Sequence, residues 1–256
     1  MNHTNVNWGR WRTFFAARSG RGLPALEDPQ DYSAVPASVA RSLAIFQLGE
    51  SGGGTIVEQA RNSRIGSADE SYAGALQLFV DEEHRHAELL AICVRNLGGS
   101  LIRRNWTADL FVFGRRLLGL RLKVLVLLVA EVVGLCYYHL LATRLPESRV
   151  RSLLTQIVND ERSHLQFHCS FLRAEVCSPW RRLVFRAVWR TVMLGAAAVT
   201  LLDHRAALRD VDLPAGVVWR RWMSYSRAAE RLITCSGTAP RPRAASWPRR
   251  NPCRSA

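Results

Sequence analysis

The chain has 256 residues, 48% of them apolar, which is enough to bury a core and excludes a disordered chain. Its 35 basic and 21 acidic side chains give a formal net charge of +14, and Lys123 is the single lysine. Residues 177–256 hold 15 Arg against 4 acids, so most of the basicity belongs to the C-terminal third. No nucleic-acid-binding motif accompanies this charge, and we expect no specific nucleic-acid partner.

The six cysteines show neither a CxxC pair nor regular spacing. This argues against a zinc ribbon, a thioredoxin motif and a disulfide framework, and it favours a reducing compartment. We therefore expect a cytoplasmic protein. Peripheral attachment at the inner face of a membrane stays open as an alternative.

Residues 1–35 are predicted to form an N-terminal arm. The first 26 residues contain four Arg, several aromatic side chains and no acid, and they lack the continuous apolar segment of a secretory signal. We expect either a frayed arm or a short packing helix here.

Beyond residue 36, apolar side chains recur at helical spacing, and Pro and Gly fall between the apolar stretches, which predicts an all-α fold. Ser67 and Glu70 form a capping-box pattern at the start of the second predicted helix, and Gly98-Gly99 mark its end. Helices are predicted over residues 36–62, 67–97, 107–118, 119–143, 146–177, 180–203 and 214–235.

These helices divide the chain into a four-helix bundle over residues 36–178 and a basic helical extension over residues 179–235. Residues 236–256 form a third part, which has five Arg, four Pro and no acid. This composition predicts a disordered tail.

Two predicted helices are apolar along most of their length. The segment from Val124 to Thr143 is long enough to span a membrane, but a charged Glu131 would be costly there, so we favour a buried central helix. The segment from Leu183 to Leu202 carries Arg186 and Arg190 in its first half and is more typical of an interfacial helix.

A short pattern occurs twice, on the second and fourth long helices. Residues 80–86 read VDEEHRH and residues 158–164 read VNDERSH, so both contain Glu-x-x-His. Glu and His at i and i+3 lie about 60° apart on a helix, and both side chains can reach one point in a bundle core. Asp81 and His84 offer a second register, but only Glu83-His86 aligns with Glu161-His164.

Two further glutamates stand at matching intervals before these motifs. Glu50 precedes Glu83 by 33 residues, and Glu131 precedes Glu161 by 30. Glu131 lies in the most apolar stretch of the chain, where a carboxylate needs a partner. A dinuclear metal site built from two Glu-x-x-His motifs and two further glutamates would supply that partner.

These residues resemble the ferritin-like di-iron carboxylate superfamily, which includes rubrerythrins, bacterioferritins, the small subunit of ribonucleotide reductase and several di-iron oxygenases. The resemblance covers residues 36–176 and implies a ferritin-like four-helix bundle with additional C-terminal helices. It implies six metal ligands: Glu50, Glu83, His86, Glu131, Glu161 and His164.

The resemblance also implies roles for these residues and their neighbours. Glu83 and Glu161 would bridge two iron ions, while Glu50 and Glu131 would be more terminal; an Fe/Mn or a manganese pair stays open. By the same resemblance, Glu82 and Asp160 would accept hydrogen bonds from the histidine ligands. Helical spacing, independently, places His168 on the face of Glu161 and His164, and Tyr138 on the face of Glu131. We expect both side chains to contact the ligands from outside, with an additional ligand at His168 and ordinary core packing as alternatives.

Glycines surround the first candidate ligand, at Gly49, Gly52, Gly53 and Gly54. Glycine inside a helix costs about 1 kcal/mol relative to Ala. The cluster therefore predicts either space for dioxygen or substrate beside Glu50, or close helix packing or a broken helix.

Three functions stay open. The first is a non-haem di-iron oxygenase or oxidase that uses dioxygen and an electron donor on a small apolar organic substrate. The second is iron handling, as a ferroxidase or storage protein. The third is a binding module in which residues 180–235 dock on an anionic membrane and the metal site is structural or vestigial. A homodimer is compatible with each.

Overall fold

The computed structural model describes residues 6–24, 35–52, 55–107 and 119–234. All regular structure in these ranges is helical, which confirms the predicted all-α class. The helices are α1 (Trp8–Ser19), α2 (Ala37–Glu50), α3 (Thr55–Arg61), α4 (Glu70–Asn96), α6 (Leu120–Ala142), α7 (Arg149–Glu175), α8 (Pro179–Asp203), α9 (Arg205–Asp210) and α10 (Ala215–Thr234).

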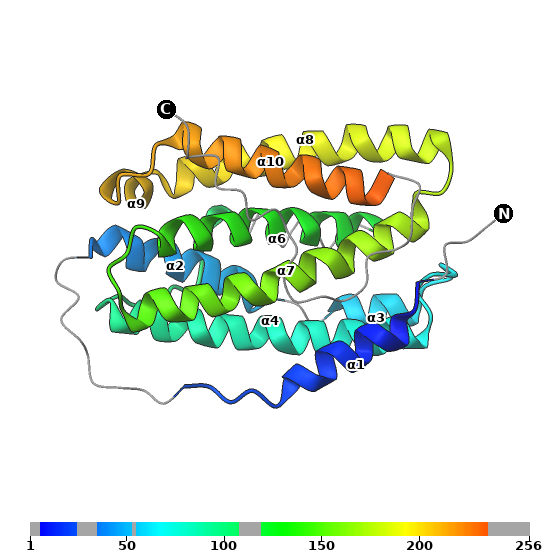
Figure 1. The fold of residues 1–256 in the computed structure, drawn as a ribbon, viewed down its shortest axis with the longest axis horizontal. Helices are drawn as coiled ribbons and strands as arrows, with labels where there is room; N and C mark the ends of the chain where they lie inside the picture. Colours follow the sequence, from blue (N-terminus) through cyan, green and yellow to red (C-terminus); the bar gives the residue numbers. More distant parts are fainter. Residues whose placement is uncertain (1–5, 25–34, 53–54, 108–118, 235–256) are drawn as a thin grey trace.

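The long helices run along the long axis of the molecule in stacked layers (Figure 1). The helices α6 and α7 form the middle layer, α4 lies on one side of them with α1 against it, and α8 and α10 lie on the other side. Trp222 of α10 links two of these layers by donating to the Val133 carbonyl on α6, and within the outer layer Trp189 of α8 donates to the Ser226 carbonyl on α10.

Two helix starts differ from the predicted ones. The α4 helix begins at Glu70 because the Asp69 carboxylate accepts from the Tyr72 amide, at 2.8 Å, and serves as the N-cap. Ser67, the predicted cap, instead donates to the Glu175 carboxylate. The α7 helix begins at Arg149, where the Ser148 hydroxyl accepts from the Arg151 amide, and not at residue 146.

The predicted helix over residues 36–62 is two helices. The α2 helix ends at Glu50, and α3 begins at Thr55 after the glycine-rich stretch. The chain also forms α9 between the two C-terminal helices, which the sequence pattern does not predict. Most of the predicted 107–118 helix, and the 236–256 tail, lie outside the described residues.

The most apolar helix is buried at the centre of the molecule. Both α6 and α8 are long and apolar enough to cross a membrane, but 78% of the most apolar window of α6 is buried among other helices. This agrees with the interpretation of residues 124–143 as a central helix. In α8 the corresponding buried share is only 22%, so one face of that helix is open.

The N-terminal segment forms a packing helix. In α1, Trp8, Trp11 and Phe15 are buried, and their spacing places them on one face. The Trp11 ring lies 5.5 Å from Phe167 of α7, and the Trp8 ring lies 4.8 Å from Tyr72 of α4. Aromatic packing therefore fixes α1 across the surface of α4 and α7.

We expect Trp11→Ala to lower the free energy of unfolding by about 3–5 kcal/mol, because it removes a fully buried indole and leaves a cavity under α1. Chemical denaturation followed by circular dichroism measures this. Trp180→Ala is the matched control: its side chain is 70% exposed, and the change should stay within about 0.5 kcal/mol. Equal effects of the two substitutions would contradict the docking of α1.

Candidate metal centre

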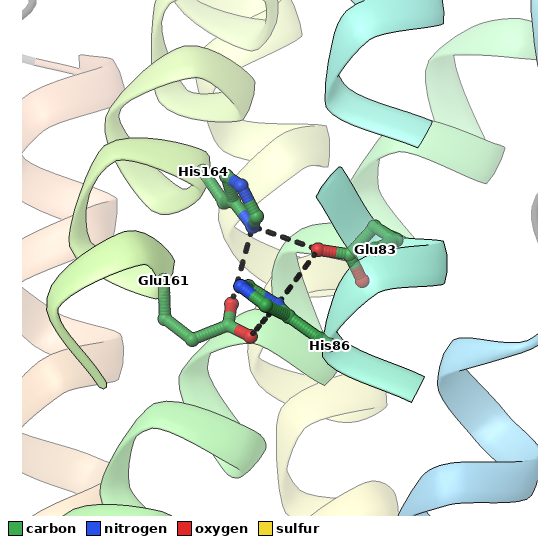
Figure 2. A group of neighbouring side chains, drawn as sticks. All are labelled: Glu83, His86, Glu161 and His164. Atoms are coloured by element: carbon green, nitrogen blue, oxygen red, sulfur yellow. Dashed lines mark ion pairs between the residues drawn. The ribbon is translucent and has the colours of Figure 1, made fainter. Parts of the chain in front are cut away.

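Two helices bring four metal-ligand side chains to one point. Figure 2 shows Glu83 and His86 of α4 facing Glu161 and His164 of α7. One ligating atom from each side chain can be chosen so that all four lie within 4.8 Å of one another. All four residues are buried.

The register of α4 is the one that the repeated motif predicts. Glu83 and His86 face α7, whereas Asp81 and His84 of the alternative register are exposed. The two-residue offset between the Asp81-His84 and Glu83-His86 pairs is about 200° on the helix, which places the two pairs on nearly opposite faces.

Each histidine is oriented by an acid on the other helix. His164 Nε2 lies 2.9 Å from Glu82 Oε2, and His86 Nε2 lies 3.5 Å from Asp160 Oδ2. Both acids immediately precede the glutamate of their own motif, so the two contacts cross between α4 and α7. The ionised Glu82 carboxylate can only accept, so we assign the proton to Nε2 of His164.

The inner nitrogens of both rings point at the glutamates. His164 Nδ1 lies 2.7 Å from Glu83 Oε1 and 3.5 Å from Glu161 Oε2, and His86 Nδ1 lies 3.1 Å from Glu161 Oε1. Neither Nδ1 atom has a partner in hydrogen-bonding geometry, and neither does Glu83 Oε1 or Glu161 Oε2. In a neutral imidazole whose Nε2 carries the proton, Nδ1 offers a lone pair. A cation between these lone pairs and the carboxylate oxygens would satisfy all of them.

The two further glutamates border the same cluster. Glu50 of α2 interacts with Glu83 and accepts a 2.9 Å hydrogen bond from the Tyr138 hydroxyl. Glu131 of α6 lies with Oε2 3.8 Å from His164 Nδ1. The structure thus brings together all six residues that the sequence analysis selects as ligands.

The predicted neighbours of the ligands take different places. Tyr138 binds Glu50, as above, while Glu82 and Asp160 face the outer nitrogens of the histidines. His168 is buried with Nε2 3.5 Å from Glu131 Oε1, and neither ring nitrogen has a hydrogen-bond partner. Burial, and then the charge of His164, lower the pKa of His168 to about 3, so its ring is neutral.

The four inner glutamates fall into two protonation classes. Burial, and then the charges of Glu83 and Glu161, raise the pKa of Glu50 and of Glu131 well above the usual range. Burial also acts to raise the pKa of Glu83 and Glu161. In Glu83 the charge of His164 outweighs burial, so that the pKa is well below its usual range. In Glu161 the neighbouring Glu131 and the two histidines outweigh burial, and the pKa is about 2.

The histidines supply the matching positive charge. Burial alone would lower the pKa of His86 and His164, but the surrounding carboxylates raise both well above the usual range. Two imidazolium groups then balance two ionised glutamates. Divalent metal could replace these protons and balance the glutamates in the ionised form, so the residues present fit a metal site.

Sequence reasoning misses the basic layer outside the cluster. Arg18 of α1 hydrogen-bonds Asp160, and its Nη2 lies 2.8 Å from Glu82 Oε1. Arg21 and Arg85 also reach Asp160, at 3.0 and 3.4 Å. These guanidinium groups neutralise the two acids that orient the histidines.

A signal for this layer is present in the sequence. Trp8, Trp11, Phe15 and Arg18 occupy positions i, i+3, i+7 and i+10, which lie on one face of a helix. An arginine that continues an aromatic stripe is expected to be partly buried, and Arg18 is 10% exposed.

An apolar cavity of about 410 Å³ borders the carboxylates. Its wall includes all four inner glutamates together with side chains of α2, α4, α6 and α8. Gly49 and Gly52 line it, as expected for space beside Glu50, and Gly53 and Gly54 lie outside the described residues. A larger, open depression of about 830 Å³ between α1 and α7 touches none of the six candidate ligands.

Three polar side chains outside the cluster also line the cavity: Thr107, Thr200 and His204. His204 Nδ1 lies 2.7 Å from the Ser42 hydroxyl oxygen, which also hydrogen-bonds the Tyr137 hydroxyl. Burial lowers the pKa of His204 to about 4, so the ring is neutral. The otherwise apolar cavity therefore has groups that can hydrogen-bond one polar function of a bound molecule.

Comparison of the chain with protein-family models, with curated proteins and with solved structures finds no match.

We expect Arg18→Ala to lower the free energy of unfolding by about 3 kcal/mol, because it leaves two buried carboxylates short of a partner. Arg18→Lys should recover only part of this loss, since an ammonium group lacks the planar fork that reaches both acids. Arg10→Ala, an exposed arginine on the same helix, is the control for denaturation experiments. A loss no larger than that of the control would contradict the proposed role of Arg18.

Gly49→Ala should raise the free energy of unfolding by about 0.5–1 kcal/mol, because alanine is the better helix former. A Cβ added at Gly49 meets no atom within 4 Å, so the methyl group fits into open space and the backbone does not have to move. Gly99→Ala is the opposite control, since its Cβ would lie 2.6 Å from the Ala40 Cβ. Thermal denaturation distinguishes the two, and a destabilised Gly49→Ala protein would show that this glycine is needed for packing.

Proposed function

We propose that the protein is a di-iron carboxylate oxygenase or oxidase of the ferritin-like type, with an Fe/Mn or manganese pair as alternatives. The observation that carries the proposal is the inner face of the cluster. There, unpartnered Nδ1 atoms of His86 and His164 meet buried oxygens of Glu83 and Glu161. This donor set of imidazole and carboxylate suits iron or manganese.

In this proposal Glu83, His86, Glu161 and His164 would hold the metal pair, and Glu50 and Glu131 would complete the ligand set. A reduced pair of such ions can pass two electrons to dioxygen. The protein's own part is to orient the ligands. Glu82 and Asp160 hold the outer nitrogens of the histidines, and Tyr138 donates a hydrogen bond to Glu50.

The cavity favours oxidation of an organic substrate over iron storage. Its wall combines the four inner glutamates with apolar side chains of α6 and α8, and it has the volume for a small organic molecule. A storage site needs room for iron and dioxygen only. The substrate class that fits is a small apolar molecule with one polar group within reach of Thr107, Thr200 or His204.

Anaerobic loading with Fe(II), followed by metal analysis and measurement of dioxygen uptake, tests the proposal. We expect two iron ions per chain and uptake that stops once these are oxidised. Glu131→Ala should lose at least one ion, whereas Glu88→Ala, an exposed glutamate on α4, should keep both.

Other outcomes decide against the proposal. A protein that binds neither iron nor manganese has no such centre. Continued uptake of iron far beyond two ions per chain, in a large cage detected by light scattering, would establish iron storage. Unchanged metal content in Glu131→Ala would mean that α6 does not supply a ligand.

A further inference from the structure

One helix carries most of the exposed large apolar side chains of the described residues. Five of eight such side chains lie on α8: Trp180, Leu183, Val184, Leu194 and Leu202. Their exposed fractions run from 42% to 70%. They are spaced at i, i+3, i+4, i+14 and i+22, which places them within about 100° of one another around the helix.

The positions between them do not interrupt this face. Ala187, Thr191 and Ala198 have the same orientation by helical periodicity, are exposed and carry no charge. We call these eight residues the outer stripe of α8. It follows the whole length of a 25-residue helix, and clustered apolar exposure on this scale marks a docking surface.

The opposite face of α8 holds the helix against the body of the protein. Phe185, Trp189, Met193 and Ala197 are buried, and the Trp189 indole donates to the Ser226 carbonyl of α10. A helix fixed along one side cannot cross a bilayer while the rest of the fold stays intact. Its outer stripe can, however, lie in the plane of a membrane interface.

The charge around the stripe suits an anionic surface. Within α8 the only acid is the last residue, Asp203, whereas Arg186 and Arg190 follow one edge of the stripe. Glu230 of α10 pairs with both, at 3.5 and 2.7 Å, so one carboxylate faces two guanidinium groups. Basic side chains beside exposed apolar ones are the features of helices that bind anionic lipid.

The cavity reaches the surface in the middle of this helix. Val192, Gly195, Ala196, Val199 and Thr200 of α8 line the cavity. Gly195 is also exposed, and a Cβ added there meets no atom within 4 Å. Gly195 follows Leu194 of the outer stripe, so an opening of the cavity at this glycine would lie beside the stripe.

We propose that the outer stripe of α8 lies on the surface of an anionic phospholipid membrane and that the cavity receives an apolar, membrane-dissolved substrate through the opening at Gly195. The substrate part of this proposal rests on the proposed oxygenase function, whereas the docking part does not. An apolar molecule would then pass from lipid to the carboxylate cluster with little exposure to water.

Flotation of the full chain with vesicles tests the docking. We expect binding to vesicles of phosphatidylcholine and phosphatidylserine at 3:1, and at least about tenfold weaker partitioning of Leu183→Glu/Leu194→Glu. Leu23→Glu/Leu101→Glu makes the same change in charge at exposed leucines outside α8 and should bind as the wild type does. The docking proposal is overturned if the wild-type protein does not float with the vesicles, or if the control variant loses as much binding as the stripe variant does. It is also overturned if light scattering shows that the wild type is a dimer and that the stripe variant is a monomer, because the stripe would then be a dimer interface.

Binding of the fluorescent apolar probe N-phenyl-1-naphthylamine tests the opening. Gly195→Trp should weaken probe binding at least about tenfold, whereas Ala198→Trp, an exposed residue that does not line the cavity, should leave it unchanged. Wild-type probe binding by Gly195→Trp overturns the entry route. Metal content is measured on the same samples. A protein that binds vesicles and probe but no iron would refute the oxygenase proposal and leave the docking proposal standing.

Discussion

The structure depends on how four glutamates are accommodated at one buried point. Ionised carboxylates are costly to bury, and Glu50, Glu83, Glu131 and Glu161 are close enough to interact with one another. The raised pKa values of Glu50 and Glu131 and the charged histidines are the protein's own response to this concentration of negative charge. In the proposed function divalent cations would provide the same balance without these protons, and the neutral histidines would then offer Nδ1 lone pairs to the cations.

The charges around this point alternate in successive layers. The inner glutamates face the histidines, the outer acids Glu82 and Asp160 face the other nitrogens of the same rings, and Arg18 faces both acids. Each layer therefore compensates the charge of the previous one. The aromatic stripe of α1 serves this arrangement, because its packing against α4 and α7 holds the Arg18 guanidinium group over the buried acids.

The sequence predicts the centre of the site better than its boundary. The Glu-x-x-His repeat and the matching glutamates select the residues that the structure brings together, because helical periodicity converts spacing directly into direction. Helix ends depend instead on local competition, and here Asp69 caps α4 while Ser67 binds Glu175 across 108 residues of sequence. The role of Arg18 is equally non-local, since its partners Glu82 and Asp160 become neighbours only after α1, α4 and α7 have packed. Helical spacing in α1 indicates that Arg18 is partly buried, but it does not indicate which acids the side chain contacts.

The two sides of the cluster differ in polarity, and this difference bears on how molecules could approach it. Toward α1 the inner glutamates and histidines are backed by ion pairs, where Asp160 alone meets three guanidinium groups. Toward α2, α6 and α8 the inner glutamates face an apolar cavity. Gly49, Gly52 and Gly195 line this cavity and contribute no side chain to its wall. Displacing the ion pairs would cost free energy and give an apolar molecule no favourable contact. Entering the cavity is favourable, because it removes the apolar surface of the molecule from water. The charged side therefore orients the histidines of the cluster, and under the proposed function an organic substrate would approach from the α8 side.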